Sequence, residues 1–282
     1  MKRDINSEIL KKINASTLYR ERIKEDCERQ NVFFAIRGNE IDLYHKGGRL
    51  FCFDRNGFKT HYKYASLLSK LTDDYLSENE LSKFEVTHDF VKTYPQIKEN
   101  CSKFSGVEAE GVSSLYHGGS YLSENEIVVL DIEVSFKSYK EGKKQDRIDI
   151  LLYNRSSKSL QFVEAKHFSN KEIWSTKEPK VINQIKRYEK QIDKRKQEIL
   201  REYSTYVLIL NRMFGIDLPQ PEKVEDAVTL LIFGFDNDQK YGRLETLVTK
   251  NKYFNGIKCY AVGDIKGKNV IKGIWNAGMI NA

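Results

Sequence analysis

Three apolar stretches near the middle of the chain decide the fold: IVVLDIEVSF (127–136), RIDILLY (147–153) and LQFVEAK (160–166). They are rich in β-branched and aromatic residues, which favour extended backbone. Polar residues separate them, so each stretch is expected to form one strand of a sheet. A short helix is predicted before them, at 103–117, and a longer helix after them, at 180–203.

Three further apolar runs follow the long predicted helix, at 204–210, 227–235 and 257–262, and are also predicted to be strands. The run STYVLIL at 204–210 is continuous, which is typical of a strand buried on both faces. The order of a helix, three strands, a helix and a strand favours an α/β fold with its core in roughly 101–235. We expect a mixed central sheet flanked by helices.

The first hundred residues show a different pattern of elements. A charged helix is expected over 1–30, and the glycines of His45-Lys46-Gly47-Gly48 are typical of a tight hairpin turn. Strands are predicted at 32–36, 40–45 and 49–53, and partly helical segments at 62–72 and 78–100. We therefore predict an N-terminal helix and β-rich region of unknown role at 1–100 and a second domain at 101–282.

The composition indicates which binding partners and which cellular location to expect. The 282 residues carry a net charge of +7 and a pI of about 9.0, which favours a polyanion such as nucleic acid. The four cysteines and five histidines are scattered along the chain, so a structural zinc site is not expected. The chain has neither the long apolar run of a membrane span nor the apolar core of a signal peptide, so we expect a cytoplasmic protein without membrane partners.

Charged residues in the apolar stretches point to a site. Residues two apart in a strand share a face, so Glu164 and Lys166 are expected to project together. If the following hairpin closes on Asn154 and Ser159, Asp149 falls directly opposite Glu164. Directly opposed residues have Cβ atoms about 4.5–5.5 Å apart. Two carboxylates held that close repel each other unless a cation lies between them.

A third carboxylate can join this pair. If 127–136 pairs with 147–153 around Glu141-Gly142, Glu133 lies opposite Asp149, and three acidic residues form a row across three strands. In the alternative interpretation, Asp131 and Glu133 both face solvent on a half-exposed strand. Oxygen ligands of this kind suit Mg²⁺ or Mn²⁺, which accept phosphate oxygens and activate a bound water. Lys166 is then placed to orient that water and to offset negative charge on the phosphate.

Asp149, followed after fourteen intervening residues by Glu164-Ala165-Lys166, resembles the motif of the PD-(D/E)xK nuclease superfamily, although Arg147-Ile148 stand where the family has its proline. This superfamily includes restriction endonucleases, Holliday-junction resolvases and RecB-type exonuclease domains. The resemblance covers about 60 residues, 127–188. It implies a restriction-endonuclease-like α-β-β-β-α-β core, metal ligands at Asp149 and Glu164, and a catalytic role for Lys166. The family often adds an upstream glutamate, and Glu133, Glu108 and Glu110 all remain candidates for it.

The long predicted helix carries a second resemblance. Gln184-Ile185-Lys186-Arg187-Tyr188 is similar to the Gln-x-x-x-Tyr element of RecB-type nucleases. Residues four apart share a helix face, so Gln184 and Tyr188 can both reach the site. Arg187, Lys190 and Lys194 are expected to follow a phosphate backbone.

Together these patterns predict a Mg²⁺- or Mn²⁺-dependent nuclease. The resemblance favours DNA over RNA as substrate and suggests a role in restriction, phage defence or repair. Two alternatives stay open. The chain could be a catalytically silent nucleic-acid-binding module, or an assembly component whose N-terminal region holds a second copy or a partner protein.

Overall fold

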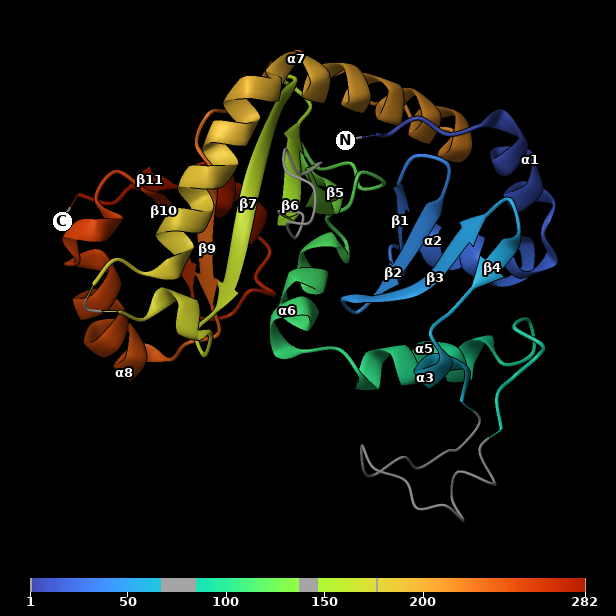
Figure 1. Cartoon of the computed structure of the whole chain (residues 1–282), viewed down its shortest axis with the longest axis horizontal. Coiled ribbons are helices and arrows are strands. Elements are labelled where there is room, and N and C mark those ends of the chain that lie inside the picture. The colour runs from blue at the N-terminus through green and yellow to red at the C-terminus, as the bar shows by residue number, and fades with distance from the viewer. Residues whose placement is uncertain (1, 67–84, 137–146, 176, 282) are drawn as a thin grey trace, which may run out of the picture. The chain divides into compact units, whose positions relative to one another are not determined.

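The computed structural model describes residues 2–66, 85–136, 147–175 and 177–281. The chain divides into two compact units, Asp4–Glu110 and a second unit made of Gly111–Ala282 together with Met1–Arg3 (Figure 1). The boundary lies at 110/111, whereas the sequence pattern suggested 100/101. The predicted helical stretches at 67–72 and 78–84 and the Glu141-Gly142 turn lie outside the described residues.

The N-terminal unit holds a four-stranded antiparallel sheet in the order β1-β2-β3-β4. Its strands are β1 (Phe33–Ile36), β2 (Ile41–His45), β3 (Gly48–Asp54) and β4 (Gly57–Lys59). Its helices are α1 (Ser7–Ala15), the π-helix η1 (Tyr19–Ile23), α2 (Lys24–Glu28), α3 (Tyr62–Ala65) and α5 (Tyr94–Lys103). The first three strands are those that the sequence predicted, and β4 was not expected.

Two local predictions for this unit have different outcomes. The predicted hairpin is confirmed, because His45 pairs with Gly48 and both turn residues, Lys46 and Gly47, have positive φ angles of 46° and 84°. A single helix over 1–30 is wrong. The chain becomes extended at Ser16, where ψ is 132°, and a second helical stretch that includes η1 and α2 follows over 17–28.

The second unit contains a mixed seven-stranded sheet, in the order β11-β10-β9-β7-β6-β5 with the short β8 paired to β7. Its strands are β5 (Ile127–Ser135), β6 (Arg147–Asn154), β7 (Ser159–His167), β8 (Lys223–Val224), β9 (Thr229–Phe233), β10 (Lys258–Val262) and β11 (Gly278–Met279). Strands β5, β6 and β7 are antiparallel neighbours, whereas β7, β9 and β10 run parallel. The predicted α/β class and mixed sheet are confirmed.

Helices connect these strands. They are α6 (Val107–Tyr116), which begins in the first unit, η2 (Lys171–Ile173), α7 (Lys180–Phe214), α8 (Asn237–Gln239), η3 (Lys240–Thr249), η4 (Lys252–Phe254) and α9 (Val270–Trp275). Helix α7 makes the crossover from β7 to the parallel strand β9, and its N-terminal half runs alongside the sheet in Figure 1. None of the described helices is both long enough and apolar enough to span a membrane.

The predicted strand at 204–210 is wrong, because these residues belong to the last turns of α7. Tyr203, Tyr206, Val207 and Leu210 are fully buried at helical spacing, while the side chain of Leu208 between them is 42% exposed. The helix ends at Gly215, whose φ of 66° is the left-handed cap that glycine favours. A short apolar run has the same composition in a buried strand and in a half-buried helix, so composition alone misassigned it.

Strand β6 is the centre of the core of this unit. Ile150, Leu151, Leu152 and Tyr153 are all fully buried, so both faces of the strand are covered. The strand before it, β5, contains a β-bulge between Val129 and Asp131. A bulge adds one residue to a strand and so reverses which face the following side chains occupy. This shift decides where the acidic residues of β5 lie.

Candidate metal and phosphate site

The pairing of β6 with β7 brings two acidic residues to neighbouring positions. Asn154 pairs with Ser159, as predicted, and the register continues to Ile150 opposite Val163. The paired residues end there, and Asp149 and Glu164 are the next residues along the two strands. The Asp149 side chain also reaches β7, because its Oδ2 accepts a hydrogen bond of 2.8 Å from the backbone N–H of Ala165.

Glu164 and Lys166 lie on one face of β7 and contact each other. The Lys166 ammonium is 2.8 Å from Glu164 Oε1 and 3.1 Å from Glu172 Oε2, so it lies between two carboxylates. The Glu164 and Lys166 side chains are only 1% and 7% exposed, whereas that of Glu172 is 43% exposed. Burying charged groups costs free energy unless they are paired with opposite charges. Here Lys166 is paired with both Glu164 and Glu172.

Glu133 occupies its predicted register position but makes a different contact. The pairs Ile132–Ile150 and Val134–Ile148 bracket it, so it aligns with Asp149. Its carboxylate forms an ion pair of 2.5 Å with Arg147 Nε. Its φ angle is 52°, a conformation that costs a residue with a side chain about 1–3 kcal/mol and that is concentrated at functional sites. Glu133 thus lies beside the site and is bound to an arginine there.

Asp131 is fully buried, which contradicts the alternative interpretation in which Asp131 and Glu133 both face solvent. Its carboxylate accepts hydrogen bonds from Arg3 Nε at 2.9 Å, from Tyr203 Oη at 2.8 Å and from the N–H of Ile132 at 2.9 Å. The bulge after Val129 turns it inward. This buried ion pair explains why Arg3 belongs to the same compact unit as the sheet.

The Gln-x-x-x-Tyr element contacts the start of β6. Gln184 Nε2 donates a hydrogen bond of 2.6 Å to Tyr188 Oη, which in turn donates one of 2.6 Å to the carbonyl oxygen of Arg147. Arg147 is two residues before Asp149. Helix α7 is therefore joined to the strand that carries the first acidic residue of the motif.

The three basic residues of α7 that were predicted to follow a phosphate backbone, Arg187, Lys190 and Lys194, are all exposed. A cavity of about 310 Å³ next to them is lined by Glu172, Lys180, Asn183, Gln184 and Arg187. Glu172 connects this cavity to Lys166. Neither Glu172 nor Lys180 was predicted as a site residue, because Glu172 lies in the connection between β7 and α7 and Lys180 at the start of α7, where no motif spacing identifies them.

The remaining candidates, Glu108 and Glu110, lie in the first turn of α6 and belong to the N-terminal unit. Of the three candidate glutamates, Glu133 is therefore the one in the same unit as Asp149.

The donor set of the site fits Mg²⁺ or Mn²⁺. Among the described residues, neither Asp149 nor Glu164 belongs to a group of three acidic, histidine or cysteine side chains whose ligand atoms all lie within 4.8 Å of one another. Magnesium is commonly held by one or two carboxylates together with waters and phosphate oxygens from the substrate. Two carboxylates on neighbouring strands meet that requirement.

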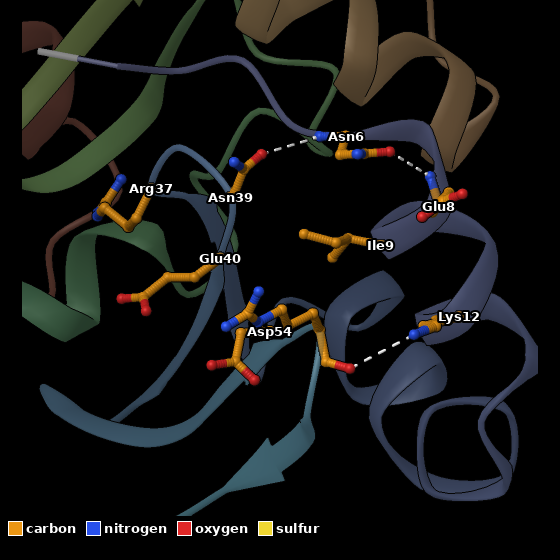
Figure 2. Close-up of a pocket in the computed structure, with 9 residues that line it drawn as sticks. Asn6, Glu8, Ile9, Lys12, Arg37, Asn39, Glu40 and Asp54 are labelled. Carbon is orange, nitrogen blue, oxygen red and sulfur yellow. Dashed lines mark hydrogen bonds between the residues drawn. The ribbon is translucent and has the colours of Figure 1, made fainter.

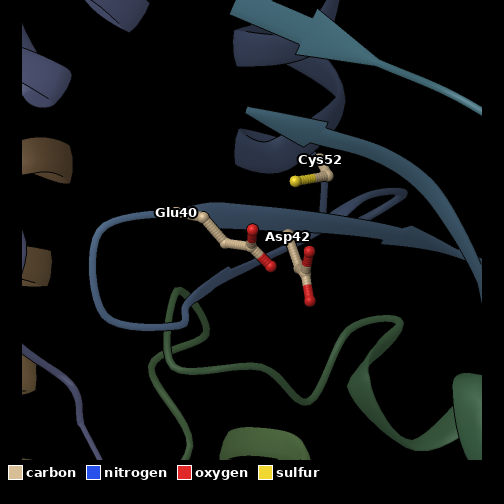
Figure 3. A group of neighbouring side chains, drawn as sticks. All are labelled: Glu40, Asp42 and Cys52. Atoms are coloured by element: carbon tan, nitrogen blue, oxygen red, sulfur yellow. The ribbon is translucent and has the colours of Figure 1, made fainter. Parts of the chain in front are cut away.

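One such group of three lies in the N-terminal unit, where Glu40, Asp42 and Cys52 face one another (Figure 3). Asp42 accepts a hydrogen bond from Tyr44 Oη at 3.0 Å and one from Arg49 at 3.3 Å. Burial, together with Glu40 and Asp42, raises the pKa of the Cys52 thiol to about 12, so it is protonated at neutral pH. Arg49 lies 3.3 Å from Asp42 and 3.8 Å from Glu40, so a cationic side chain already offsets the acidic charge of this group.

A cavity of about 590 Å³ in the same unit has a mixed lining (Figure 2). It is lined by Asn6, Glu8, Ile9, Lys12, Arg37, Asn39, Glu40, Asp54 and Arg55. Three cationic and three anionic side chains balance each other, so the lining favours no one charge of ligand.

The structure thus brings together Asp149, Glu164 and Lys166 on two adjacent strands, with Gln184 and Tyr188 at the start of the first. It adds Glu172 to the group and pairs Glu133 with Arg147.

Comparison of the chain with protein-family models, with curated proteins and with solved structures found no match.

Proposed function

We propose that the second unit is a metal-dependent nuclease that hydrolyses phosphodiester bonds. One observation carries this proposal: Asp149 reaches the backbone of Ala165, between Glu164 and Lys166, so three charged groups converge on two strands whose core is largely apolar. Buried charged groups destabilise a core compared with apolar ones, so their presence calls for a chemical reason. Binding a divalent cation and a phosphate is such a reason.

The order of elements gives further support. The chain runs α6, β5, β6, β7, α7 and β9, with β9 parallel to β7. This is the α-β-β-β-α-β order of the restriction-endonuclease-like core that the motif implies. We therefore propose that the sheet of this unit is such a core, extended at one edge by β10 and β11.

Each residue of the site has a role in this proposal. Asp149 and Glu164 would hold the ion, and Mg²⁺ or Mn²⁺, when bound, supplies charge that polarises the phosphate and acidifies a bound water. Lys166 offsets negative charge that develops on the phosphate. Gln184 and Tyr188 hold the start of β6 against α7 and so orient Asp149. Lys180 and Arg187 line the adjoining cavity, where they are placed to bind a neighbouring phosphate.

DNA is the proposed substrate, and restriction, phage defence or repair the proposed context, on the strength of the motif resemblance. The rival proposal is a catalytically silent nucleic-acid-binding module. It would keep the exposed cations of α7, but it would show no binding of Mg²⁺ that depends on the carboxylates.

A cleavage assay tests this proposal. Plasmid, linear duplex, single-stranded DNA and RNA would be incubated with Mg²⁺ or Mn²⁺ and the wild-type chain, beside the variants Asp149→Ala and Lys166→Ala. The matched control is Asp217→Asn, which changes an exposed aspartate in the same unit. We expect cleavage by wild type and control and its loss in both site variants. Cleavage that persists in Asp149→Ala would contradict the proposal.

A further inference from the structure

Three of the aromatic rings that carry a cation over one face belong to Trp174 and to the segment 240–253 of the second unit. Lys240 lies 5.2 Å from the ring centre of Tyr241, Arg243 lies 4.3 Å from that of Trp174, and Lys252 lies 5.6 Å from that of Tyr253. Tyr241 and Tyr253 are among the exposed large side chains, at 68% and 36%, and Trp174 is half-buried. We name these six residues the aromatic–cation surface.

Part of this surface lies on the connection between β7 and α7 that also carries Glu172. Trp174 directly follows η2, the turn that carries Glu172, the partner of Lys166. Its indole N–H donates a hydrogen bond of 2.8 Å to the carbonyl of Phe168, the residue after β7. Asn251, just before η4, donates a hydrogen bond of 3.3 Å to the carbonyl of Ser175. The helical segment 237–254 therefore packs on the same connection that supports Lys166.

Strand direction places both features at one edge of the sheet. β7, β9 and β10 are parallel, with His167 beside Phe233 and Phe233 beside Val262, so their carboxyl ends align. Lys166 is the next-to-last residue of β7. A cavity of about 420 Å³ lies just beyond β9 and β10, lined by Phe235, Asp236, Asn237, Lys240, Ala261, Val262 and Gly263. In open α/β sheets, ligands bind outside the carboxyl ends of the strands.

The chemistry of the surface fits unpaired nucleotides. Proteins that bind single strands combine cations along the backbone with aromatic rings on which bases stack. In a duplex the base faces are covered by neighbouring bases, so an exposed ring offers a duplex little. Segment 237–254 has four lysines and arginines against two acidic residues, and Glu245 is already paired with Lys250. The surface thus matches a polyanion that exposes flat apolar rings.

We propose that the aromatic–cation surface binds single-stranded nucleic acid and leads it to the site at Asp149, Glu164 and Lys166. This inference rests on the proposed nuclease function for the cleavage step, but the binding itself does not depend on it. Tyr241 and Tyr253 stack on bases, and Lys240, Arg243 and Lys252 contact the phosphates between them. A protein partner on the same surface would be the competing occupant, and it would leave the affinity for single strands unchanged when the two tyrosines are replaced.

Fluorescence anisotropy tests the binding step without cleavage. The Asp149→Ala chain would be titrated, in EDTA, into labelled single-stranded DNA, single-stranded RNA and duplex DNA of one mixed sequence. In this background the double variant Tyr241→Ala/Tyr253→Ala is expected to weaken single-strand binding by at least about tenfold and duplex binding by less than about threefold. The pair Tyr241→Phe/Tyr253→Phe keeps the rings and is expected to retain the affinity.

Controls make the outcome decisive. Tyr62→Ala removes a tyrosine that is 61% exposed in the N-terminal unit and is expected to leave all affinities unchanged. Circular dichroism would establish that each variant is folded. The proposal is overturned if the chain does not bind single strands, if the alanine pair weakens duplex binding equally, or if the phenylalanine pair loses affinity as the alanine pair does. Comparing the DNA and RNA arms decides which strand is preferred.

The two proposals fail in different ways. If wild type cleaves no substrate but binds single strands through Tyr241 and Tyr253, the nuclease proposal fails and this inference stands. If wild type cleaves in an Asp149-dependent manner but the alanine pair cleaves and binds single strands as wild type does, this inference fails and the nuclease proposal stands.

Discussion

Asp149 on β6 and Ala165 on β7 are joined by a hydrogen bond from the backbone N–H of Ala165 to Asp149 Oδ2, 2.8 Å long. Ala165 lies between Glu164 and Lys166, so this bond holds the first acidic residue of the motif against the other two charged residues. The position of the site therefore depends on the backbone of β7 as well as on its charged side chains.

Glu164→Gln keeps the shape of the side chain and removes its charge. We expect Mg²⁺ and Mn²⁺ to bind more weakly, because an amide is a poorer ligand than a carboxylate. Losing an outer hydrogen-bond partner of a metal ligand already costs about 10–100-fold in affinity, and losing the ligand's charge should cost no less. Isothermal titration with each ion measures this. An unchanged affinity would remove Glu164 from the metal site.

Glu172→Gln tests whether Glu172 positions Lys166. The ammonium now lies 3.1 Å from Glu172 Oε2 and 2.8 Å from Glu164 Oε1, and it would keep only the second ion pair. A displaced catalytic group can cost about 10- to 100-fold in rate, so kcat should fall in that range while KM and the Mg²⁺ affinity stay close to wild type.

The neighbouring Lys171→Gln is the matched control, because Lys171 is exposed in the same turn. Glu172→Asp should recover part of the lost rate. A fall in Mg²⁺ affinity with no change in kcat would instead identify Glu172 as a metal ligand.

Tyr188→Phe removes the hydroxyl that links α7 to β6. The carbonyl of Arg147 and the amide of Gln184 would both lose a hydrogen-bond partner. A lost hydrogen bond in a buried setting costs about 1–3 kcal/mol, so the free energy of unfolding should fall by about that amount. Urea denaturation measures it, with the exposed Tyr62→Phe as control. Equal stability of the two variants would show that this link is not needed.

The pair Leu210→Ala and Leu208→Ala tests the helical assignment of 204–210. Leu210 is fully buried and Leu208 is 42% exposed. Replacing a buried leucine with alanine lowers the free energy of unfolding by about 2–5 kcal/mol. The same substitution at an exposed position changes it by about 0.5 kcal/mol or less. A fully buried strand would give large losses at both positions. Thermal or urea unfolding of the two variants therefore distinguishes the structures.

The charged motif could be predicted from local pattern because strand geometry has a period of two and the 154–159 hairpin is short. A four-residue loop between Asn154 and Ser159 leaves little freedom of register, so the pairing from Asn154–Ser159 to Ile150–Val163 followed from the sequence. The role of Glu172 could not be predicted, because a connecting segment has no fixed periodicity. Its contact with Lys166 exists only once η2 folds against β7.

The sequence by itself determined the α/β order of helices and strands, the turn at Lys46-Gly47 and the shared face of Glu164 and Lys166. These features depend on periodicity and on backbone preferences within a few residues. Tertiary structure alone decided that 204–210 is helical, that Asp131 turns inward to Arg3, and that Trp174 meets Arg243. Each of these three features depends on residues that are far away in the sequence. Packing within the whole unit decides which of them come into contact.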